Sequence, residues 1–483
     1  MVEKKKNKKY VKIITRIIGV LSVIISIIFI GMMFYSNIIP NKFLYPAMIF
    51  ILIFTLLCTI LIFKNKAKIV LSVILLITSS LCLLGSNYFY QTIHFMDVIN
   101  NQTEEADLYY VVVLKQSKYK NIDDIEHQEM GMMESQDDNF NKALERLHVS
   151  TKEKNYQDPL QLANDLLNQK IEVIFVKNIF KDLYDDEVKN FKENTKILYE
   201  VSVKTTKENI SKKVDMTKEP FSLYISGIDV YGDMMTKSQS DVNIIMTVNP
   251  NTHEILLTSI PRDYYVQLHG TTGRKDKLTH AAYYGINMSV TTLEDLLNTK
   301  INHYFRVNFD AVIKVVDAIG GIDVYSDKAF RSTTMSGIYI NEGWNHLNGK
   351  EALAFSRERK SYATGDRHRG ENQQNVIKAM VNKVTSSPAL LTNYNEIMNI
   401  LTGSFQTDIE TKEMSDLIKF QLDKMPSWNI KTYNLNGTDS ENLTYSLGSL
   451  VRYVMEPDIK TVEQGSKYIN GMLEGKTFKE LGL

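Results

Sequence analysis

The chain has 483 residues, 44% of them apolar, and is therefore long enough for more than one folded domain. Its 56 basic and 56 acidic residues cancel, but eleven of the bases and one of the acids lie in the first 90 residues, which leaves 45 bases and 55 acids for the remainder. This acidic remainder argues against broad nucleic-acid binding, which needs many surface cations, so we expect no nucleic acid as a partner and a local cluster of cations wherever a polyanion binds.

Cysteine and histidine usage argues against catalytic zinc. Cys58 and Cys82 both lie in apolar runs near the N-terminus, so the rest of the chain has no thiol for a disulfide, a zinc site or a thiolate nucleophile. The nine histidines are scattered singly, without the i, i+4 pair of a zinc-binding helix.

Three apolar stretches open the chain, at residues 12–36, 43–63 and 69–87, and each is close to the roughly 20 residues that a helix needs to cross a bilayer. A cleaved signal peptide is the alternative for the first stretch. That stretch is longer than the apolar part of a signal peptide, however, and two more follow at once. We therefore expect residues 1–94 to form a membrane anchor with three spans.

Basic residues predict the orientation of this anchor. A lysine cluster at residues 4–9 precedes the first stretch, and Lys64, Lys66 and Lys68 separate the second from the third, whereas the intervening loop has only Lys42. Because positive loops stay in the cytoplasm, an odd number of spans places everything after about residue 88 outside the plasma membrane.

Residues 95–218 predict a small α/β accessory domain. Short apolar segments such as 109–114 and 171–176 alternate there with polar helical stretches such as 159–167. We find no catalytic constellation in this part of the sequence.

Residues 219–390 contain the pattern of a larger α/β domain. A segment with helical spacing ends there at Gly320 and Gly321, where the chain can adopt left-handed backbone geometry. The expected strands are 221–228, 242–248, 255–260 and 322–325, and the expected helices include 309–319 and 375–384. We predict a three-layer α/β fold, with residues 391–483 adding two helices and a strand as its C-terminal part.

Two acids flank the first two strands of this domain. Asp229 follows one strand and Asp241 begins the next, so antiparallel pairing would bring both carboxylates to one edge of the sheet. Two carboxylates without a histidine suit a hard cation such as Mg²⁺, completed by phosphate oxygens and water. Taken alone, such a pair is more often a loop cap or a surface charge.

Three arginines accompany these acids. Arg262 follows the third strand, and Arg357 and Arg359 have the i, i+2 spacing that, on an extended segment, directs both side chains to one face. Guanidinium groups match phosphate oxygens bidentately, so the set is typical of a pyrophosphate clamp. The alternative is ion pairing of Arg262 with Asp263, and of Arg357 and Arg359 with Glu358.

A polar segment, residues 365–374, leads directly into the helix expected at 375–384. Residues at a helix N-terminus lie where backbone amides favour an anion. If the helix already includes this segment, Arg369 and Gln373 lie one turn apart on the same face.

Taken together, these motifs resemble the LytR-CpsA-Psr family and, more narrowly, its CpsA-type capsule branch. The matching segments, in chain order, are Gly227-Ile228-Asp229, Ser240-Asp241, residues 259–263, Asn308-Phe309-Asp310, Gly320-Gly321, residues 349–357 and residues 366–374. The family domain would cover about residues 220–385, and the three spans with the accessory domain resemble the capsule branch.

The resemblance implies a function and roles for individual residues. It implies a phosphotransferase that moves a glycan phosphate, with capsular polysaccharide as the expected glycan, from a polyprenyl-pyrophosphate carrier to a sugar hydroxyl of peptidoglycan. It implies apolar side chains around the lipid tail and other capsule-synthesis proteins as further partners. The implied ligands are Asp229 and Asp241 for magnesium, and Arg262, Arg357, Arg359, Arg369 and Gln373 for pyrophosphate.

The sequence departs from the family pattern at two positions. Gln239 precedes the Ser-Asp pair, and Asn372 precedes the paired glutamines, where many members have arginine. The first change removes one cation from the donor site, and the second is usual in the capsule branch.

Phosphoryl transfer needs in-line positioning and charge neutralisation, which we assign to Arg262, Arg357 and Arg359 together with the metal. Asp366 is our candidate base for the acceptor hydroxyl, and the alternative is an ion pair between Asp366 and Arg369. Three rival functions remain. The first is transcriptional regulation, although the expected topology separates the domains from DNA. The others are binding or sensing of the lipid without turnover, and net hydrolysis of the pyrophosphate.

Overall fold

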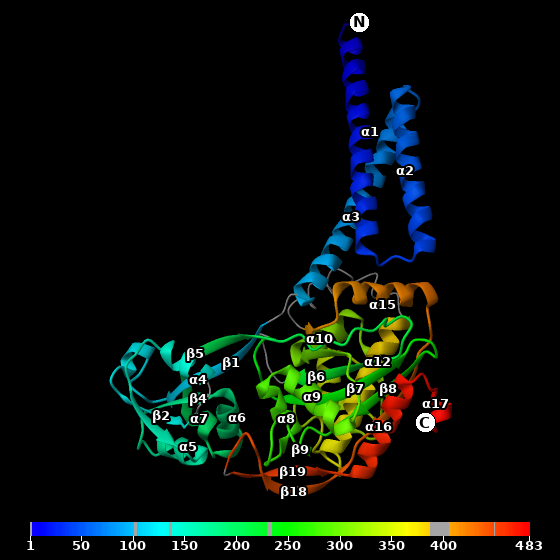
Figure 1. The fold of residues 1–483 in the computed structure, drawn as a ribbon. Coiled ribbons are helices and arrows are strands. Elements are labelled where there is room, and N and C mark those ends of the chain that lie inside the picture. Colours follow the sequence, from blue (N-terminus) through cyan, green and yellow to red (C-terminus); the bar gives the residue numbers. More distant parts are fainter. Residues whose placement is uncertain (1, 101–103, 135–137, 229–233, 387–404, 449) are drawn as a thin grey trace.

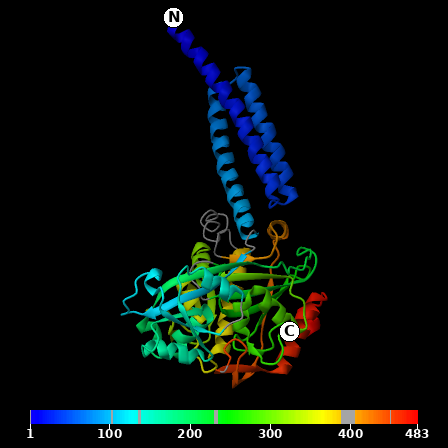
Figure 2. The same cartoon turned by 60° about the vertical axis from the view of Figure 1, so that its left-hand side comes forward.

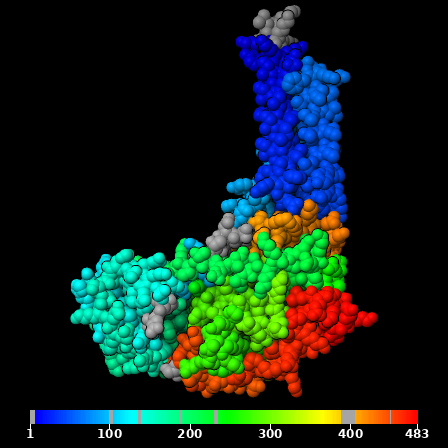
Figure 3. All heavy atoms as spheres, viewed as in Figure 1, coloured from blue at the N-terminus to red at the C-terminus, as the bar shows by residue number. Residues whose placement is uncertain are grey.

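The computed structural model describes residues 2–100, 104–134, 138–228, 234–386, 405–448 and 450–483. Three long helices rise from one side of two folded domains, and the same arrangement is visible after rotation (Figures 1 and 2). The smaller domain forms a separate lobe beside the larger one (Figure 3). The chain is thus a mixed α/β protein with an apolar helical N-terminal part, as the sequence predicts.

The N-terminal helices are α1 (Val2–Ser36), α2 (Asn41–Phe63) and α3 (Lys68–Asn100), and all three are long and apolar enough to cross a membrane. Their outward faces expose isoleucine, leucine and phenylalanine side chains, which lipid would cover. Between the helices, Thr59 donates to the Gly19 carbonyl at 3.1 Å and Ser79 to Ser22 at 2.9 Å. Small residues and hydroxyl hydrogen bonds of this kind hold apolar helices together in lipid.

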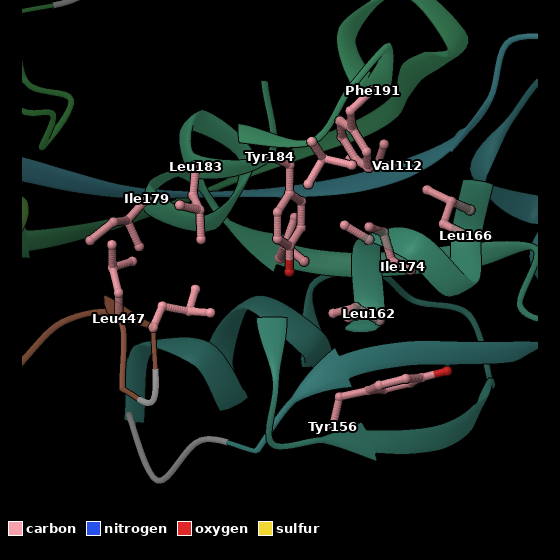
Figure 4. Packing of buried hydrophobic residues seen from close by; sticks show 14 of the residues in the cluster. Val112, Tyr156, Leu162, Leu166, Ile174, Ile179, Leu183, Tyr184, Phe191 and Leu447 are labelled. Atoms are coloured by element: carbon pink, nitrogen blue, oxygen red, sulfur yellow. The ribbon is translucent and has the colours of Figure 1, made fainter. Parts of the chain in front are cut away.

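The accessory domain is a five-stranded sheet with the strand order β3-β2-β4-β1-β5. Val112 and Ile174 pack on α5, α6 and α7 on one face (Figure 4), whereas Val111 and Phe175 belong to a second core on the other face, next to α4. Its elements are β1 (Glu104–Leu114), η1 (Ile122–Ile125), β2 (Glu129–Met133), α4 (Asp138–Glu145), β3 (Lys152–Tyr156), α5 (Pro159–Leu167), β4 (Val173–Lys177), α6 (Asn178–Glu187), α7 (Phe191–Asn194) and β5 (Thr195–Thr206).

The C-terminal domain, residues 221–483, is built on a six-stranded mixed sheet with the order β16-β11-β6-β7-β8-β17. Alternate residues of its central strands face opposite layers: Tyr224 and Ile245 pack with α9 and α16, whereas Ile225 and Ile244 pack with α12 and α15. The strands are β6 (Phe221–Ile228), β7 (Ser240–Asn249), β8 (Glu254–Ser259), β11 (His303–Asn308), β16 (Phe405–Thr407) and β17 (Asn429–Asn434), and the covering helices are α9 (Ile286–Leu297), α10 (Phe309–Ala318), α11 (Gly349–Arg357), α12 (Asp366–Ser386), α15 (Thr411–Lys424) and α16 (Ile459–Leu473). The predicted three-layer arrangement is therefore present.

Small elements complete the domain outside the central sheet. The predicted strand at 322–325 forms, but it pairs with β15 rather than with the central sheet. The C-terminal part has more strands than the one predicted from the sequence. These further elements are β9 (Tyr265–Val266), β10 (Asp276–Lys277), α8 (Leu278–Ala281), η2 (Ala282–Tyr284), β12 (Ile322–Ser326), β13 (Phe330–Arg331), β14 (Tyr339–Ile340), β15 (Gly343–Leu347), β18 (Gly437–Leu443), β19 (Val451–Pro457) and α17 (Phe478–Leu481).

A buried arginine joins the two domains. Arg306 on β11 is 1% exposed and donates to the carbonyl oxygens of Met234 at 3.1 Å and Thr236 at 2.8 Å. Burial lowers the pKa of Arg306, and the nearby Glu105 carboxylate of β1 acts in the opposite direction. Glu105 is also buried and accepts from the Ile286 amide at the start of α9, at 3.0 Å. Opposite charges from both domains therefore meet in one buried place.

The loop between α1 and α2 rests on α15, directly below the helices in Figure 1. Asn37 donates to Asp416 at 3.2 Å, Lys419 donates to Asn37 at 3.0 Å, and Lys42 contacts Asp423 at 2.9 Å. These contacts fix one face of the C-terminal domain against the ends of the apolar helices.

Helix α12 crosses the C-terminal domain from this face to the opposite one. Near its start, Arg367 donates to the Gly437 carbonyl of β18 at 2.6 Å, and near its end the Thr385 carbonyl accepts from Gln421 of α15 at 3.5 Å. The first turn of α12 therefore lies on the side of the domain away from the three long helices.

Candidate functional site

The site begins where β7 and β8 lie side by side. Because the two strands are antiparallel neighbours, the start of β7 lies next to the end of β8, with Ile244 opposite Ser259. Asp241 and Arg262 extend from these adjoining ends, and one guanidinium nitrogen of Arg262 is 2.7 Å from the Asp241 carboxylate. The sheet therefore brings Asp241 and Arg262 together, whereas the edge that the sequence predicted for Asp241 was shared with Asp229, which lies outside the described residues.

The first turn of α12 adds a second guanidinium. Arg369 lies 2.6 Å from the Asp366 carboxylate, which is also 4.0 Å from Nε of Arg262. Gly370 permits this approach, because a Cβ atom at that position would lie 2.8 Å from the Ser259 hydroxyl. The absence of a side chain at Gly370 therefore lets α12 pack against the end of β8.

Helix α12 begins at Asp366, nine residues before the predicted start at 375. Arg369 and Gln373 are thus one turn apart, both are buried, and both line a small cavity of about 30 Å³. Of the two alternatives for this segment, the one in which the helix already includes both residues is correct. The cavity is also lined by Asp241, Arg262 and Asp366.

The pKa values of the two guanidiniums are shifted in opposite directions, although burial lowers both. Burial alone would lower the pKa of Arg262, but the carboxylates of Asp241, Asp263 and Asp366 raise it above the ordinary value. Burial, and next the Arg262 cation, lower the pKa of Arg369. Two mutually repelling cations are therefore held in place by surrounding carboxylates, and a bound polyanion would relieve that repulsion.

Asp263 completes the cluster around Arg262. Its carboxylate is 3.0 Å from the Lys277 ammonium and 3.5 Å from Nε of Arg262. Burial would raise the pKa of Asp263, but the Arg262 and Lys277 cations lower it. The ion pair of Arg262 with Asp263 that the sequence suggested as an alternative is present, in addition to the contact with Asp241.

The extended geometry expected for residues 354–359 is wrong. Asn348 and Glu351 form a capping box, in which each side chain binds the other residue's backbone N–H, and this starts α11 before the segment. Arg357 is the last residue of that helix, and its guanidinium lies 4.5 Å from the centre of the Phe309 ring. Arg359 follows the helix, is exposed and lines a second cavity together with Arg262.

Glu358 has a structural role between these two arginines. Its carboxylate is fully buried and accepts from the Thr333 amide at 2.7 Å and the Ser361 amide at 3.1 Å. Burial would raise the pKa of Glu358, but the hydrogen bonds from Thr333 and Ser361 lower it. The turn after α11 is thereby fixed, and the carboxylate is directed to backbone amides rather than to the neighbouring arginines.

The metal prediction concerns Asp229 and Asp241. Asp229 lies outside the described residues. Among the residues that the structure describes, no group of three acidic, histidine or cysteine side chains is placed to hold a metal ion. Mg²⁺ is commonly bound by one or two carboxylates plus substrate phosphates rather than by an all-protein cage, so the Asp241 carboxylate, which lines the small cavity, fits that donor set.

Sequence reasoning missed the pair formed by Asp276 and His280. Nδ1 of His280 is 2.7 Å from the Asp276 carboxylate, and His280 lines the same cavity as Arg359. The i, i+4 spacing of an acid and a histidine was the available signal.

Comparison with known proteins agrees with these motifs. Residues 188–464 match the profile of the LytR_cpsA_psr family. The teichoic acid transferase TagU of Bacillus anthracis, described as a polyisoprenyl-teichoic acid–peptidoglycan transferase, is 36% identical over 212 residues, which cover 44% of this chain and 67% of TagU. The protein of the same name from Enterococcus faecalis is 36% identical over 224 residues, covering 46% of this chain and 71% of that protein.

Among solved structures, B. subtilis TagV is 32% identical, with a TM-score of 0.45, over 53% of this chain and 98% of that chain. The family match spans more than half of the chain and includes Asp241, Arg262, Arg357, Arg359, Asp366, Arg369 and Gln373. The chain therefore belongs to the LytR_cpsA_psr family.

Proposed function

We propose that this protein is a magnesium-dependent phosphotransferase that moves a glycan phosphate from a polyprenyl-pyrophosphate carrier to peptidoglycan. The observation that carries the proposal is the buried cluster of Arg262 and Arg369 with their carboxylates at the ends of β7, β8 and α12. The names of the related transferases support the same class of donor and acceptor. For the glycan we propose capsular polysaccharide, because three apolar helices and an accessory domain accompany the family domain.

The described residues support separate roles for Arg262, Arg369, Gln373 and Arg359 in binding phosphate. Arg262 is the central cation, because it lines both cavities and faces three carboxylates. Arg369 and Gln373, on the first turns of α12, line the small cavity together with Arg262. Arg359 lines the larger cavity, which Arg262 also borders. Guanidinium groups in this arrangement would neutralise charge on the transferred phosphate and orient it for in-line attack.

Magnesium, when bound, would supply further positive charge to the pyrophosphate, with Asp241 and Asp229 as its proposed protein ligands. In the structure, Asp241 contacts Arg262. Asp241 would hold the ion, and the Arg262 guanidinium beside it would bind phosphate oxygens of the donor.

Replacing Asp241 with asparagine tests both the metal and the reaction. We expect wild-type protein to transfer labelled glycan from the carrier to peptidoglycan with Mg²⁺, and to lose this activity in chelator. Asp241→Asn should lose most of it at any Mg²⁺ concentration, because the amide keeps the shape but removes the charge that offsets the metal. Asp323→Asn, an exposed acid paired with His346, is the matched control. Carrier lipid bound without product would favour the lipid-binding alternative, and full wild-type activity in chelator would contradict the magnesium proposal.

We further propose that the three helices span the plasma membrane and that both domains lie outside the cell. The basic flanks at residues 4–9 and 64–68 support this orientation. Protease added to intact, wall-stripped cells should then digest residues after α3 and leave a protected fragment of about the size of the anchor. Complete protection of the two domains would refute the topology and the extracellular reaction together.

A further inference from the structure

The second cavity lies between the two domains and has a volume of about 390 Å³. Asp182 and Leu183 of α6 form its wall on the accessory side, and Arg262, Lys277 and His280 form part of the opposite wall. Of the described residues, Arg262 is the one that lines both this cavity and the small cavity beside Asp241 and Arg369. Neither domain alone would enclose the second cavity.

Contacts across this boundary hold the cavity together. The Tyr283 hydroxyl donates to the Asp182 carboxylate at 2.6 Å. Leu447, in the segment between β18 and β19, packs with Ile179 and Leu183 of α6, as Figure 4 shows. Helix α6 is thus fixed over the cavity by a hydrogen bond and by apolar contacts.

A histidine–aspartate pair lies in the wall of this cavity. Asp276 is fully buried, and its carboxylate accepts hydrogen bonds from the Ser446 amide at 2.9 Å and from the Lys277 amide at 2.8 Å. The same carboxylate lies 2.7 Å from Nδ1 of His280. A carboxylate can only accept, so a neutral imidazole hydrogen-bonded to it would carry its proton on Nδ1 and keep the lone pair on Nε2. Nε2 has no hydrogen-bond partner among the residues that the structure describes.

The backbone fastens this pair to the donor site. The Thr279 amide donates to the Arg262 carbonyl at 2.9 Å, and the Leu278 amide donates to the Tyr264 carbonyl at 2.9 Å. The helix that bears His280 is therefore connected by two hydrogen bonds to the loop that bears Arg262. A group bound in the cavity would therefore face a wall that carries both His280 and Arg262.

We propose that this cavity binds the acceptor sugar of peptidoglycan and that His280 is the base for its attacking hydroxyl. The inference rests on the proposed phosphotransfer. The hydroxyl oxygen forms a bond to the phosphorus that carries the glycan, its proton passes to Nε2 of His280, and the bond between that phosphorus and the bridging oxygen breaks. The bridging oxygen leaves with the electron pair as part of polyprenyl phosphate, and the imidazolium later releases the proton to water.

Two features favour this assignment over the alternatives. The described lining of the cavity has four cations, Arg262, Lys277, Arg359 and Arg452, against two carboxylates, Asp182 and Asp263, so this excess of positive charge suits an acceptor sugar that carries a carboxylate. Asp366, the base suggested by the sequence, is 2.6 Å from the Arg369 guanidinium and serves to position it. A purely structural His280 would satisfy Asp276 equally well, and the experiment must separate the two roles.

The test uses the full-length protein in lipid vesicles, a polyprenyl-pyrophosphate-linked disaccharide as donor and purified peptidoglycan strands as acceptor. His280→Ala and His280→Gln should lower kcat for transfer by about 10²- to 10⁴-fold, the usual contribution of a general base, while donor affinity stays within about twofold. Added imidazole should restore part of the rate to His280→Ala, because it can occupy the vacated space. His269→Ala is the matched control, since His269 has the same 2.7 Å contact with a carboxylate, Asp295, but is exposed.

The outcomes separate the inference from the proposed function. If the wild-type protein transfers glycan and either His280 variant has the same kcat, the inference is overturned and the phosphotransferase proposal stands. An equal loss of donor affinity and transfer, without imidazole rescue in a variant that melts at the wild-type temperature, would show a structural histidine and would also overturn it. No transfer by the wild-type protein would overturn both.

Discussion

Arg262→Ala should lower the rate of glycan transfer by roughly 10²- to 10³-fold, which corresponds to about 2.7–4 kcal/mol of transition-state stabilisation. Among the residues that the structure describes, the Arg262 guanidinium is the one cation that borders both the small cavity and the larger cavity, and Asp241, Asp263 and Asp366 hold it in place. Arg262→Lys should recover little activity, because a point charge lacks the bidentate fork. Rates are measured at saturating Mg²⁺ with labelled donor.

An exposed arginine provides the control for this substitution. Arg331 lies 5.9 Å from the centre of the Tyr339 ring, on the β13–β14 pair, and lines neither cavity, so Arg331→Ala should transfer at the wild-type rate. Circular dichroism and melting temperature must show that Arg262→Ala is folded. A folded variant with more than half of the wild-type rate would mean that the arginine cluster does not serve phosphotransfer.

Arg306→Met should destabilise the folded protein by about 3–5 kcal/mol. The substitution keeps much of the side-chain volume but leaves Glu105 buried without its counter-charge and removes the donors to Met234 and Thr236. Denaturant unfolding is followed by tryptophan fluorescence in a Trp344→Phe background, so that Trp428, which lies beside Phe420 in the C-terminal domain, is the sole reporter.

A double-mutant cycle distinguishes charge loss from packing loss at this junction. Arg274→Met, at an exposed arginine, should change stability by less than about 0.5 kcal/mol. The double variant Glu105→Gln/Arg306→Met should lose less free energy of unfolding than the sum of the losses in the two single variants, because replacing Glu105 with glutamine removes the buried charge that Arg306→Met leaves unpaired. Strict additivity would show that Glu105 and Arg306 do not interact, and a loss below about 1 kcal/mol would refute the structural role of Arg306.

Much of the fold was predictable because it depends on local pattern. Apolar length predicted the three N-terminal helices, and the segments at 221–228 and 309–319 formed the expected strand and helix. The exceptions depend on information that periodicity does not carry. Strand β12 has strand composition, but whether it joins the central sheet or pairs with β15 depends on contacts distant in the sequence. The extended geometry considered for residues 354–359 came from the spacing of Arg357 and Arg359, and the capping box that starts α11 makes residues up to Arg357 helical instead.

The candidate site was predictable as a set of residues but not as an arrangement. Asp241, Arg262 and Arg369 come together as the motifs indicated. Arg357 and Arg359 do not share one face of a strand, because the helix ends between them. The cavity that includes His280 could not be foreseen, since its walls come from two domains and from the segment before β19. Asp229 lies outside the described residues, and its role as a metal ligand stays a prediction.

The course of α12 has a consequence for the carrier lipid. Its 21 residues span about 30 Å, from the arginine cluster at its first turn to α15 beneath the apolar helices. If the proposed carrier binds at the arginine cluster and the three helices lie in a bilayer, the phosphate end of the carrier would lie up to about one α12 length from the membrane, and its tail would have to return along the domain. A carrier whose polyprenyl chain is too short to cover that distance would have to leave the bilayer completely to react. The length of the polyprenyl chain would then become a criterion of substrate selection.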